Sequence, residues 1–162
     1  IQKNNLNIEI ANDNSPMQVV VSGLIEDLEK SQNIFISNGV KRFVKLNVSS
    51  AFHSKFMNEA QKLLMHEIDK IKFFSTSIPI ISNYDSSLNI KKDDIINSLK
   101  KQMANQVKWT QSIKKLEETE TSKIIEIGPG KVLSGLINRI TNKFDIISID
   151  KIEDLDKLRK DL

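Results

Sequence analysis

The chain has 162 residues with 24 basic and 21 acidic side chains, a formal net charge of +3 at pH 7, and no cysteine. This length can bury a hydrophobic core without metals or disulfides, and the lack of cysteine excludes a disulfide framework, a thiolate nucleophile and a cysteine-based zinc site. The basic residues are spread evenly, and no apolar run reaches the roughly 20 residues of a membrane helix, so neither nucleic acid nor a membrane is expected as a partner. These features favour a cytoplasmic protein.

Two short β-rich runs lie near the start of the chain, at residues 7–11 and 17–22, with the turn-forming sequence NDNSP between them. This pattern predicts a hairpin. From Leu24 the apolar residues follow helical spacing, and Gly39 is placed to end that helix. The stretch 41–48 then returns to alternation, which predicts a third strand. The first fifty residues are thus predicted to be β, β, α, β.

Beyond residue 50 the pattern changes to helices and strands in alternation. A helix is predicted from Ser54, with these apolar side chains on one face: Phe56, Ala60, Leu63, Leu64, Ile68 and Ile71. The later predicted elements are a strand at 78–82, helices at 95–103 and 109–116, a strand before the turn at 128–130, a helix after it, a strand in FDIISID, and a surface helix marked by Ile152, Leu155 and Leu158. Such alternation is typical of a parallel sheet, so the predicted fold class is α/β.

The Gly-rich turn GPGK at 128–131 has two interpretations. Between a strand and a helix, such a turn can cradle a phosphate with its backbone N–H groups. It is too short for either the dinucleotide or the P-loop fingerprint, so a tight turn that needs glycine conformations is favoured. His66 lies beside the buried face of the predicted long helix, and metal-ligand spacing is absent, so we expect no metal site.

His53 is the main candidate for a functional residue. It lies where a β-type segment gives way to a helix, a location that often points a side chain into a cleft. An imidazole can hold and release a proton near neutral pH, so a catalytic base is one interpretation. On position alone, a helix-start residue with a satisfied imidazole is the other.

Four fragments in the same order favour the catalytic interpretation. They are ANDNSPMQVVVSG, NVSSAFHSKFM, NQVKWTQSI and IEIGPGKVLSGLINRI, and together they resemble the C-terminal half of the malonyl-CoA:acyl carrier protein transacylases. The resemblance covers nearly the whole chain. It implies a partial ferredoxin-like (ββαβ) small subdomain at 1–50 and, at 51–162, the C-terminal part of an α/β-hydrolase-like acyltransferase core. The function it implies is malonyl transfer from malonyl-CoA to acyl carrier protein in fatty-acid biosynthesis, in a bacterial cytoplasm or an organelle of bacterial origin.

The resemblance also implies roles for individual residues. His53 matches the family's catalytic base and acid, and Lys108 matches the position whose backbone carbonyl receives the other ring N–H. Asn12, Asn14 and Gln18 match the edge of the substrate cleft, where they would bind coenzyme A or carrier protein. Coenzyme A enters as part of a thioester substrate, so neither a bound cofactor nor a metal is implied.

The chain departs from the family in one decisive respect. Its five glycines include no pair that flanks a serine as G-x-S-x-G, the elbow that carries the family's nucleophile. The family's oxyanion segment and malonate-binding arginine precede the region present here, and Arg42 matches a structural position only. We therefore expect the chain to need a missing N-terminal half, to be inactive alone, and to have unpaired sheet edges and a tendency to aggregate.

Two other functions stay open. One is a fragment of a polyketide-synthase-type acyltransferase, which uses the same chemistry with another acyl group. The other is a non-catalytic chain that binds carrier protein or complements a separate half.

Overall fold

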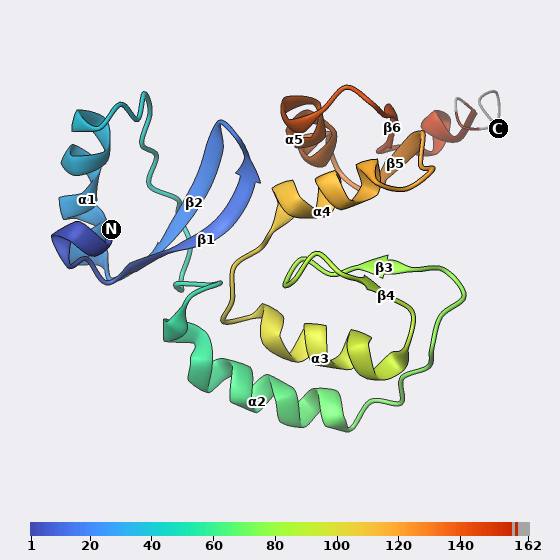
Figure 1. Ribbon diagram of the computed structural model, residues 1–162, viewed down its shortest axis with the longest axis horizontal. Helices are drawn as coiled ribbons and strands as arrows, with labels where there is room; N and C mark the ends of the chain where they lie inside the picture. Colours follow the sequence, from blue (N-terminus) through green and yellow to red (C-terminus); the bar gives the residue numbers. More distant parts are fainter. Residues whose placement is uncertain (157, 159–162) are drawn as a thin grey trace.

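The computed structural model describes residues 1–156 and 158, and in this part of the chain it contains three two-stranded sheets and five α-helices (Figure 1). The strands are β1 (Ile8–Ser15), β2 (Gln18–Gly23), β3 (Ile80–Ile81), β4 (Leu88–Asn89), β5 (Lys123–Ile127) and β6 (Asp145–Ile149). The α-helices are α1 (Ile25–Ser37), α2 (Asn58–Asp69), α3 (Lys92–Gln102), α4 (Trp109–Glu117) and α5 (Val132–Ile140). Three short 3-10 helices are η1 (Gln2–Asn4), η2 (Lys55–Met57) and η3 (Ile152–Asp154). None of the described helices is both long and apolar enough to cross a membrane.

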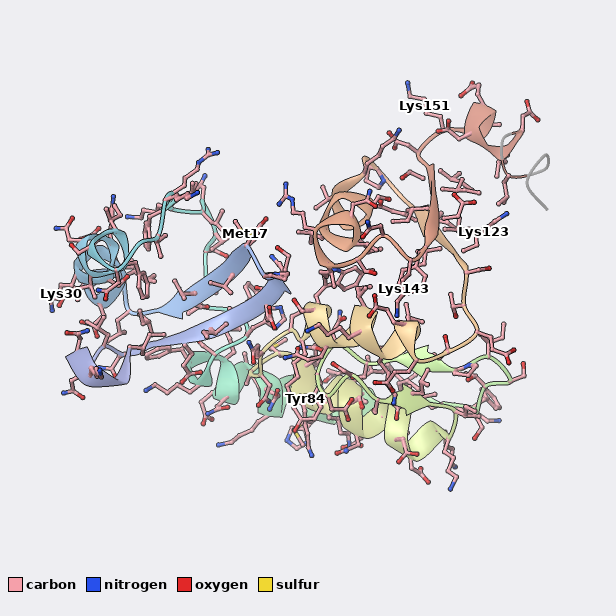
Figure 2. The ribbon with its side chains drawn as sticks, turned by 45° about the horizontal axis from the view of Figure 1, so that its top comes forward. Met17, Lys30, Tyr84, Lys123, Lys143 and Lys151 are labelled. Carbon is pink, nitrogen blue, oxygen red and sulfur yellow. The ribbon has the colours of Figure 1, made fainter. Side chains whose placement is uncertain are left out.

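The predicted hairpin is confirmed: β1 pairs with β2 in antiparallel fashion, and the turn between them carries the exposed Met17 (Figure 2). The register shifts twice, between Ile10 and Asn12 and between Asp13 and Ser15. Such bulges bend a strand and increase its twist. The bent β1 contacts α4 and α5, so the hairpin lies against helices that come much later in the chain.

Gly23 is required at the end of β2 because the backbone of the opposite strand lies against it. A Cβ at this position would lie 2.7 Å from Ile8 Cα and even closer to the Asn7 carbonyl oxygen. We expect Gly23→Ala to lower the free energy of unfolding by about 1–3 kcal/mol, as overpacking does. The matched control is Gly135→Ala in α5, where a Cβ meets nothing within 4 Å and alanine favours the helix by about 1 kcal/mol. Urea unfolding of both variants would contradict this account if their stabilities shifted in the same direction.

Residues 41–48 were predicted as a strand, and that prediction is wrong. They form neither helix nor strand, and within the described chain no backbone–backbone hydrogen bond involves them. Val44, Leu46 and Val48 are 55%, 54% and 66% exposed. An alternating pattern places apolar side chains on one face of an extended segment, but a strand also needs a neighbouring strand to pair with. Without that neighbour, the backbone N–H and C=O groups form hydrogen bonds with water.

The helix predicted from Ser54 is confirmed as η2 followed by α2, but its apolar face is only partly covered. α2 packs against α3 and buries Ile68, whereas Leu63 is 71% exposed and Phe56 and Ile71 are exposed as well. The sequence thus carries more apolar surface on this helix than the described elements bury.

The parallel pairing predicted for the last strands is confirmed, because β5 and β6 run parallel with Ile125 opposite Ile147. The core of this region is formed by Ile113, Ile137 and Phe144, with Trp109, Leu116, Ile124, Ile140 and Ile146 packed against them. On the other face of the sheet, Ile127 is 80% exposed. Parallel sheets are usually covered on both faces, so this sheet is only half enclosed.

Two further predictions are confirmed in part. The strand predicted at 78–82 is only β3, which pairs with β4 in a short antiparallel hairpin. The predicted tail helix begins with η3 and continues in helical conformation at Leu155, Asp156 and Leu158, while residues 157 and 159–162 lie outside the described part of the chain.

Candidate functional site

His53 lies in the loop that leads into η2, and its backbone has an unusual conformation. Its φ is +60°, in the left-handed region that residues other than glycine seldom adopt. The His53 N–H donates to the Met103 carbonyl at 3.0 Å. The C-terminal end of α3, where Met103 is the C-cap, therefore holds the histidine in place.

The imidazole ring is held by a second hydrogen bond to the same segment. Nδ1 lies 3.0 Å from the Gln102 carbonyl oxygen. Because a carbonyl oxygen can only accept, Nδ1 must carry the hydrogen, and in the neutral ring Nε2 is then left without one. Among the described residues Nε2 has no hydrogen-bond partner, so a lone pair is available for proton transfer.

The carbonyl that orients His53 is not the one expected from the sequence. The Lys108 carbonyl instead accepts hydrogen bonds from the hydroxyls of Ser86 and Ser112, at 3.2 and 3.0 Å. The expectation for Lys108 is thus corrected to Gln102, six positions earlier. No sequence signal could have found it, because every residue has a backbone carbonyl and only the chain path selects one.

The three polar residues expected at the substrate edge lie on the β1–β2 hairpin. Asn12 forms a parallel bridge with Val107, in the stretch that follows the end of α3. The amides of Asn12 and Asn14 make no hydrogen bond within the described structure. Gln18 lies apart from them, because its Oε1 accepts a hydrogen bond from Arg139 of α5 at 2.8 Å.

The serines closest in sequence to His53 are not placed as nucleophiles. Ser54 is fully buried, and its hydroxyl donates to the Ala51 carbonyl at 2.6 Å. Ser49 and Ser50 are exposed and lie outside any strand or helix. A nucleophile elbow requires a strained strand-to-helix turn that presents the hydroxyl, and the loop at residues 49–54 does not form one.

The Gly-rich turn after β5 is a structural turn. Gly128 and Gly130 have φ values of +143° and +81°, which only glycine adopts readily. The carboxylate of Glu126 accepts hydrogen bonds from the backbone N–H groups of Leu133 and Ser134, at 2.9 and 2.8 Å, and from the Ser134 hydroxyl. Glu126 therefore occupies the N-terminus of α5, the kind of position at which helices can bind an anion such as phosphate.

This cap predicts acid sensitivity. Burial raises the pKa of Glu126, but the hydrogen bonds from Ser134 and Leu133 outweigh it and hold that pKa below its ordinary value. The stabilisation is fully present above the unfolded-state pKa and is lost as the pH falls through the lower, folded-state pKa. We expect the melting temperature of Glu126→Gln to fall less on acidification than that of the unchanged chain. Glu120→Gln, at an exposed glutamate, is the control, and equal acid dependence in all three proteins would contradict the prediction.

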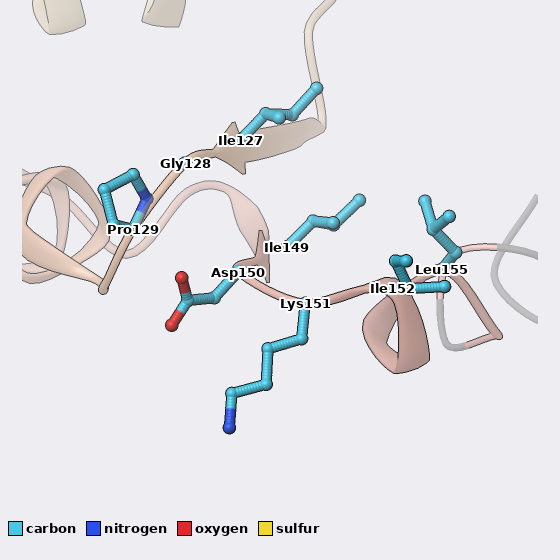
Figure 3. A pocket seen from close by; sticks show the side chains of 8 residues that line it. All are labelled: Ile127, Gly128, Pro129, Ile149, Asp150, Lys151, Ile152 and Leu155. Carbon is cyan, nitrogen blue, oxygen red and sulfur yellow. The ribbon is translucent and has the colours of Figure 1, made fainter.

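A shallow hollow of about 360 Å³ lies at the carboxyl ends of β5 and β6 (Figure 3). Its lining includes the apolar side chains of Ile127, Ile149, Ile152 and Leu155. Figure 3 shows the Lys151 side chain pointing away from these residues. An open apolar surface of this kind is typical of a place where further protein packs.

The chain is similar in sequence to several bacterial proteins. No model of a known protein family matches the chain. The polyketide biosynthesis protein PksE of Bacillus subtilis is 44% identical over 84% of the chain, which covers 18% of that protein. The malonyl CoA-acyl carrier protein transacylase of the same organism is 34% identical over 92% of the chain, which covers 47% of it.

Solved structures that resemble the chain are also malonyl transacylases. The malonyl-CoA:ACP transacylase of Synechocystis sp. PCC 6803 matches with a TM-score of 0.88 and 33% identity, over 96% of this chain and 52% of that one. A structure of a type II PKS acyl-carrier protein in complex with its malonyl-transacylase matches with a TM-score of 0.91 and 30% identity. The match covers 96% of this chain and 50% of the chain in that structure. The chain spans about half the length of the transacylases that it matches. The chain is therefore a homologue of about half of a malonyl-CoA:acyl carrier protein transacylase.

Proposed function

We propose that this chain is the C-terminal, histidine-bearing part of an enzyme that moves a malonyl group from malonyl-CoA to the phosphopantetheine thiol of acyl carrier protein. The observation that carries the proposal is the geometry of His53, whose Nδ1 is fixed by the Gln102 carbonyl while Nε2 stays available. A general base needs this fixed orientation and one unprotonated nitrogen. The family relationship supports the choice of reaction.

In the first half-reaction, a serine hydroxyl attacks the thioester carbonyl of malonyl-CoA while His53 Nε2 takes the hydroxyl proton. The C–S bond then breaks, His53 returns the proton to the sulfur, and free coenzyme A leaves behind a malonyl-serine ester. In the second half-reaction, the carrier protein's thiol loses its proton to His53 and attacks the ester. Serine then leaves with the proton, and malonyl-carrier protein is released. Coenzyme A enters as a substrate, so the scheme uses no bound cofactor or metal.

The nucleophilic serine belongs, in this proposal, to the half of the relatives that this chain does not match, whether that half is joined to it or separate. Support comes from the absence of G-x-S-x-G and from the buried state of Ser54. The exposed side chains of Val44, Leu46, Val48 and Ile127 are further support, because they offer apolar surface for that half to cover. Residues 1–50 would then complete a ferredoxin-like subdomain, and 51–162 would complete an α/β-hydrolase-like core, in the cytoplasm.

The pathway has two candidates. Fatty-acid biosynthesis was expected from the sequence, whereas polyketide biosynthesis is favoured by the 44% identity to PksE, against 34% to the transacylase of the same organism. Malonylation rates with a fatty-acid carrier protein and a polyketide carrier protein would decide between them. A non-catalytic complementing chain is the alternative from another functional class.

The proposal is tested with a hybrid enzyme in which this chain replaces the matching half of the Bacillus subtilis transacylase. We expect the hybrid to convert malonyl-CoA and carrier protein to malonyl-carrier protein, measured by intact mass. A folded hybrid that binds carrier protein but never malonylates it would instead favour the non-catalytic chain.

A further inference from the structure

Both polar ends of the peptide unit that joins Phe52 to His53 are held by other elements. The Phe52 carbonyl accepts a hydrogen bond from the Ser22 hydroxyl at 2.6 Å. The N–H of the same peptide unit, which belongs to His53, donates to the Met103 carbonyl at 3.0 Å. Ser22 is only 8% exposed, so water competes little for this bond.

This peptide unit decides where the imidazole ring lies. With the peptide plane fixed, the side chain direction follows from φ, and the value of +60° directs the ring so that Nδ1 meets the Gln102 carbonyl. A residue other than glycine keeps such a conformation only when its surroundings hold it there. The hydrogen bonds at the two ends of this peptide therefore help to fix the position of the ring, together with the ring's own hydrogen bond.

We propose that Ser22 is a positioning residue for His53. Its hydroxyl keeps the Phe52–His53 peptide in the orientation that presents Nε2, and it links the β1–β2 hairpin to the histidine. This inference rests on the proposed role of His53 as general base. Ser54 supports the same loop through the Ala51 carbonyl, but that bond is within the loop, whereas Ser22 connects it to a separate sheet.

If the Ser22 hydroxyl is removed, the Phe52 carbonyl loses its partner and the peptide is free to turn. His53 can then leave the left-handed region, and the Nδ1–H tautomer is no longer favoured by the Gln102 carbonyl. Ser22→Thr keeps a hydroxyl on a strand that tolerates β-branched residues, so it should retain the bond.

The test uses the ¹⁵N-labelled full chain and reads the tautomer of the His53 ring from its proton–nitrogen correlation spectrum. We expect the unchanged chain and Ser22→Thr to show hydrogen on Nδ1, and Ser22→Ala to populate the Nε2–H form. The His53 amide should exchange with solvent about two- to tenfold faster in Ser22→Ala, as the loss of one neutral hydrogen bond predicts. Ser22→Cys, close in volume with a weak donor, gives the same comparison if the alanine variant does not fold.

The matched control is Ser15→Ala. Ser15 lies at the other end of the same hairpin and is also buried, and its hydroxyl accepts a hydrogen bond from the Met17 N–H within the turn. We expect no change in the His53 signals in this variant. The proposal is overturned if Ser22→Ala keeps the Nδ1–H tautomer, or if Ser15→Ala disturbs it as much. Because this readout needs no catalysis, it is independent of whether the hybrid enzyme is active.

Discussion

Replacing His53 with alanine in the hybrid enzyme is expected to slow formation of the malonyl-serine ester by about 10²–10⁴-fold, the usual contribution of a general acid–base group. Without the imidazole, the serine proton has no acceptor as the oxygen attacks, and the departing sulfur has no donor. The measurement is the single-turnover release of coenzyme A before carrier protein is added, because that step isolates the first half-reaction.

His66→Ala is the matched control for this prediction. His66 is the chain's other histidine, and it lies exposed on α2. The rate of coenzyme A release in His66→Ala should stay within about twofold of the rate in the unchanged hybrid, as expected for a surface substitution. If both variants reacted at the rate of the unchanged hybrid, His53 would be a structural residue and the proposed mechanism would be wrong.

Leu46→Lys is expected to weaken the association of this chain with the half of the Bacillus subtilis transacylase that it does not match, produced separately, by about tenfold or more. Leu46 is 54% exposed and lies in the apolar alternation of residues 41–48, which lacks a neighbouring strand. Burying a leucine side chain contributes about 1.5–3 kcal/mol, and placing an ammonium group there adds a desolvation cost. Titration calorimetry or hydrogen exchange at 41–48 would report the loss.

Asn47→Lys adds the same charge one position away, where alternation directs the side chain to the opposite face of an extended segment. It should bind the other half nearly as well as the unchanged chain. Equal weakening by both substitutions would show that charge alone, and not burial of the apolar face, controls association. A sharp, cooperative melt of the isolated chain as a monomer would also argue against the need for that half.

The elements best predicted from sequence are those whose own residues fix them. α4 and α5 have apolar residues at helical spacing, and β5 and β6 are short apolar runs bounded by turns, so local pattern and tertiary packing agree. The α/β class and the parallel pairing could therefore be derived. Position 53 could be singled out because it lies at a boundary between two types of pattern and carries a residue that transfers protons.

What could not be derived depends on partners distant in the chain. The strand predicted at 41–48 needs a neighbour that the described chain does not provide, and the apolar face of α2 needs a cover beyond Ile68. The orienting carbonyl of Gln102 carries no mark in the sequence, and neither does the hydroxyl of Ser22, one of many serines. Such contacts follow from the path of the backbone in three dimensions.

The central claim, that this chain holds the base and another polypeptide segment holds the nucleophile, is tested most directly by intact mass after mixing with malonyl-CoA. The chain is measured alone and with the separately produced unmatched half of the Bacillus subtilis transacylase. We predict a malonyl adduct on the added half only, formed rapidly with the unchanged chain and slowly with its His53→Ala variant. A malonyl adduct on this chain alone, lost in His53→Ala, would show that one of its own serines is the nucleophile and would contradict the account.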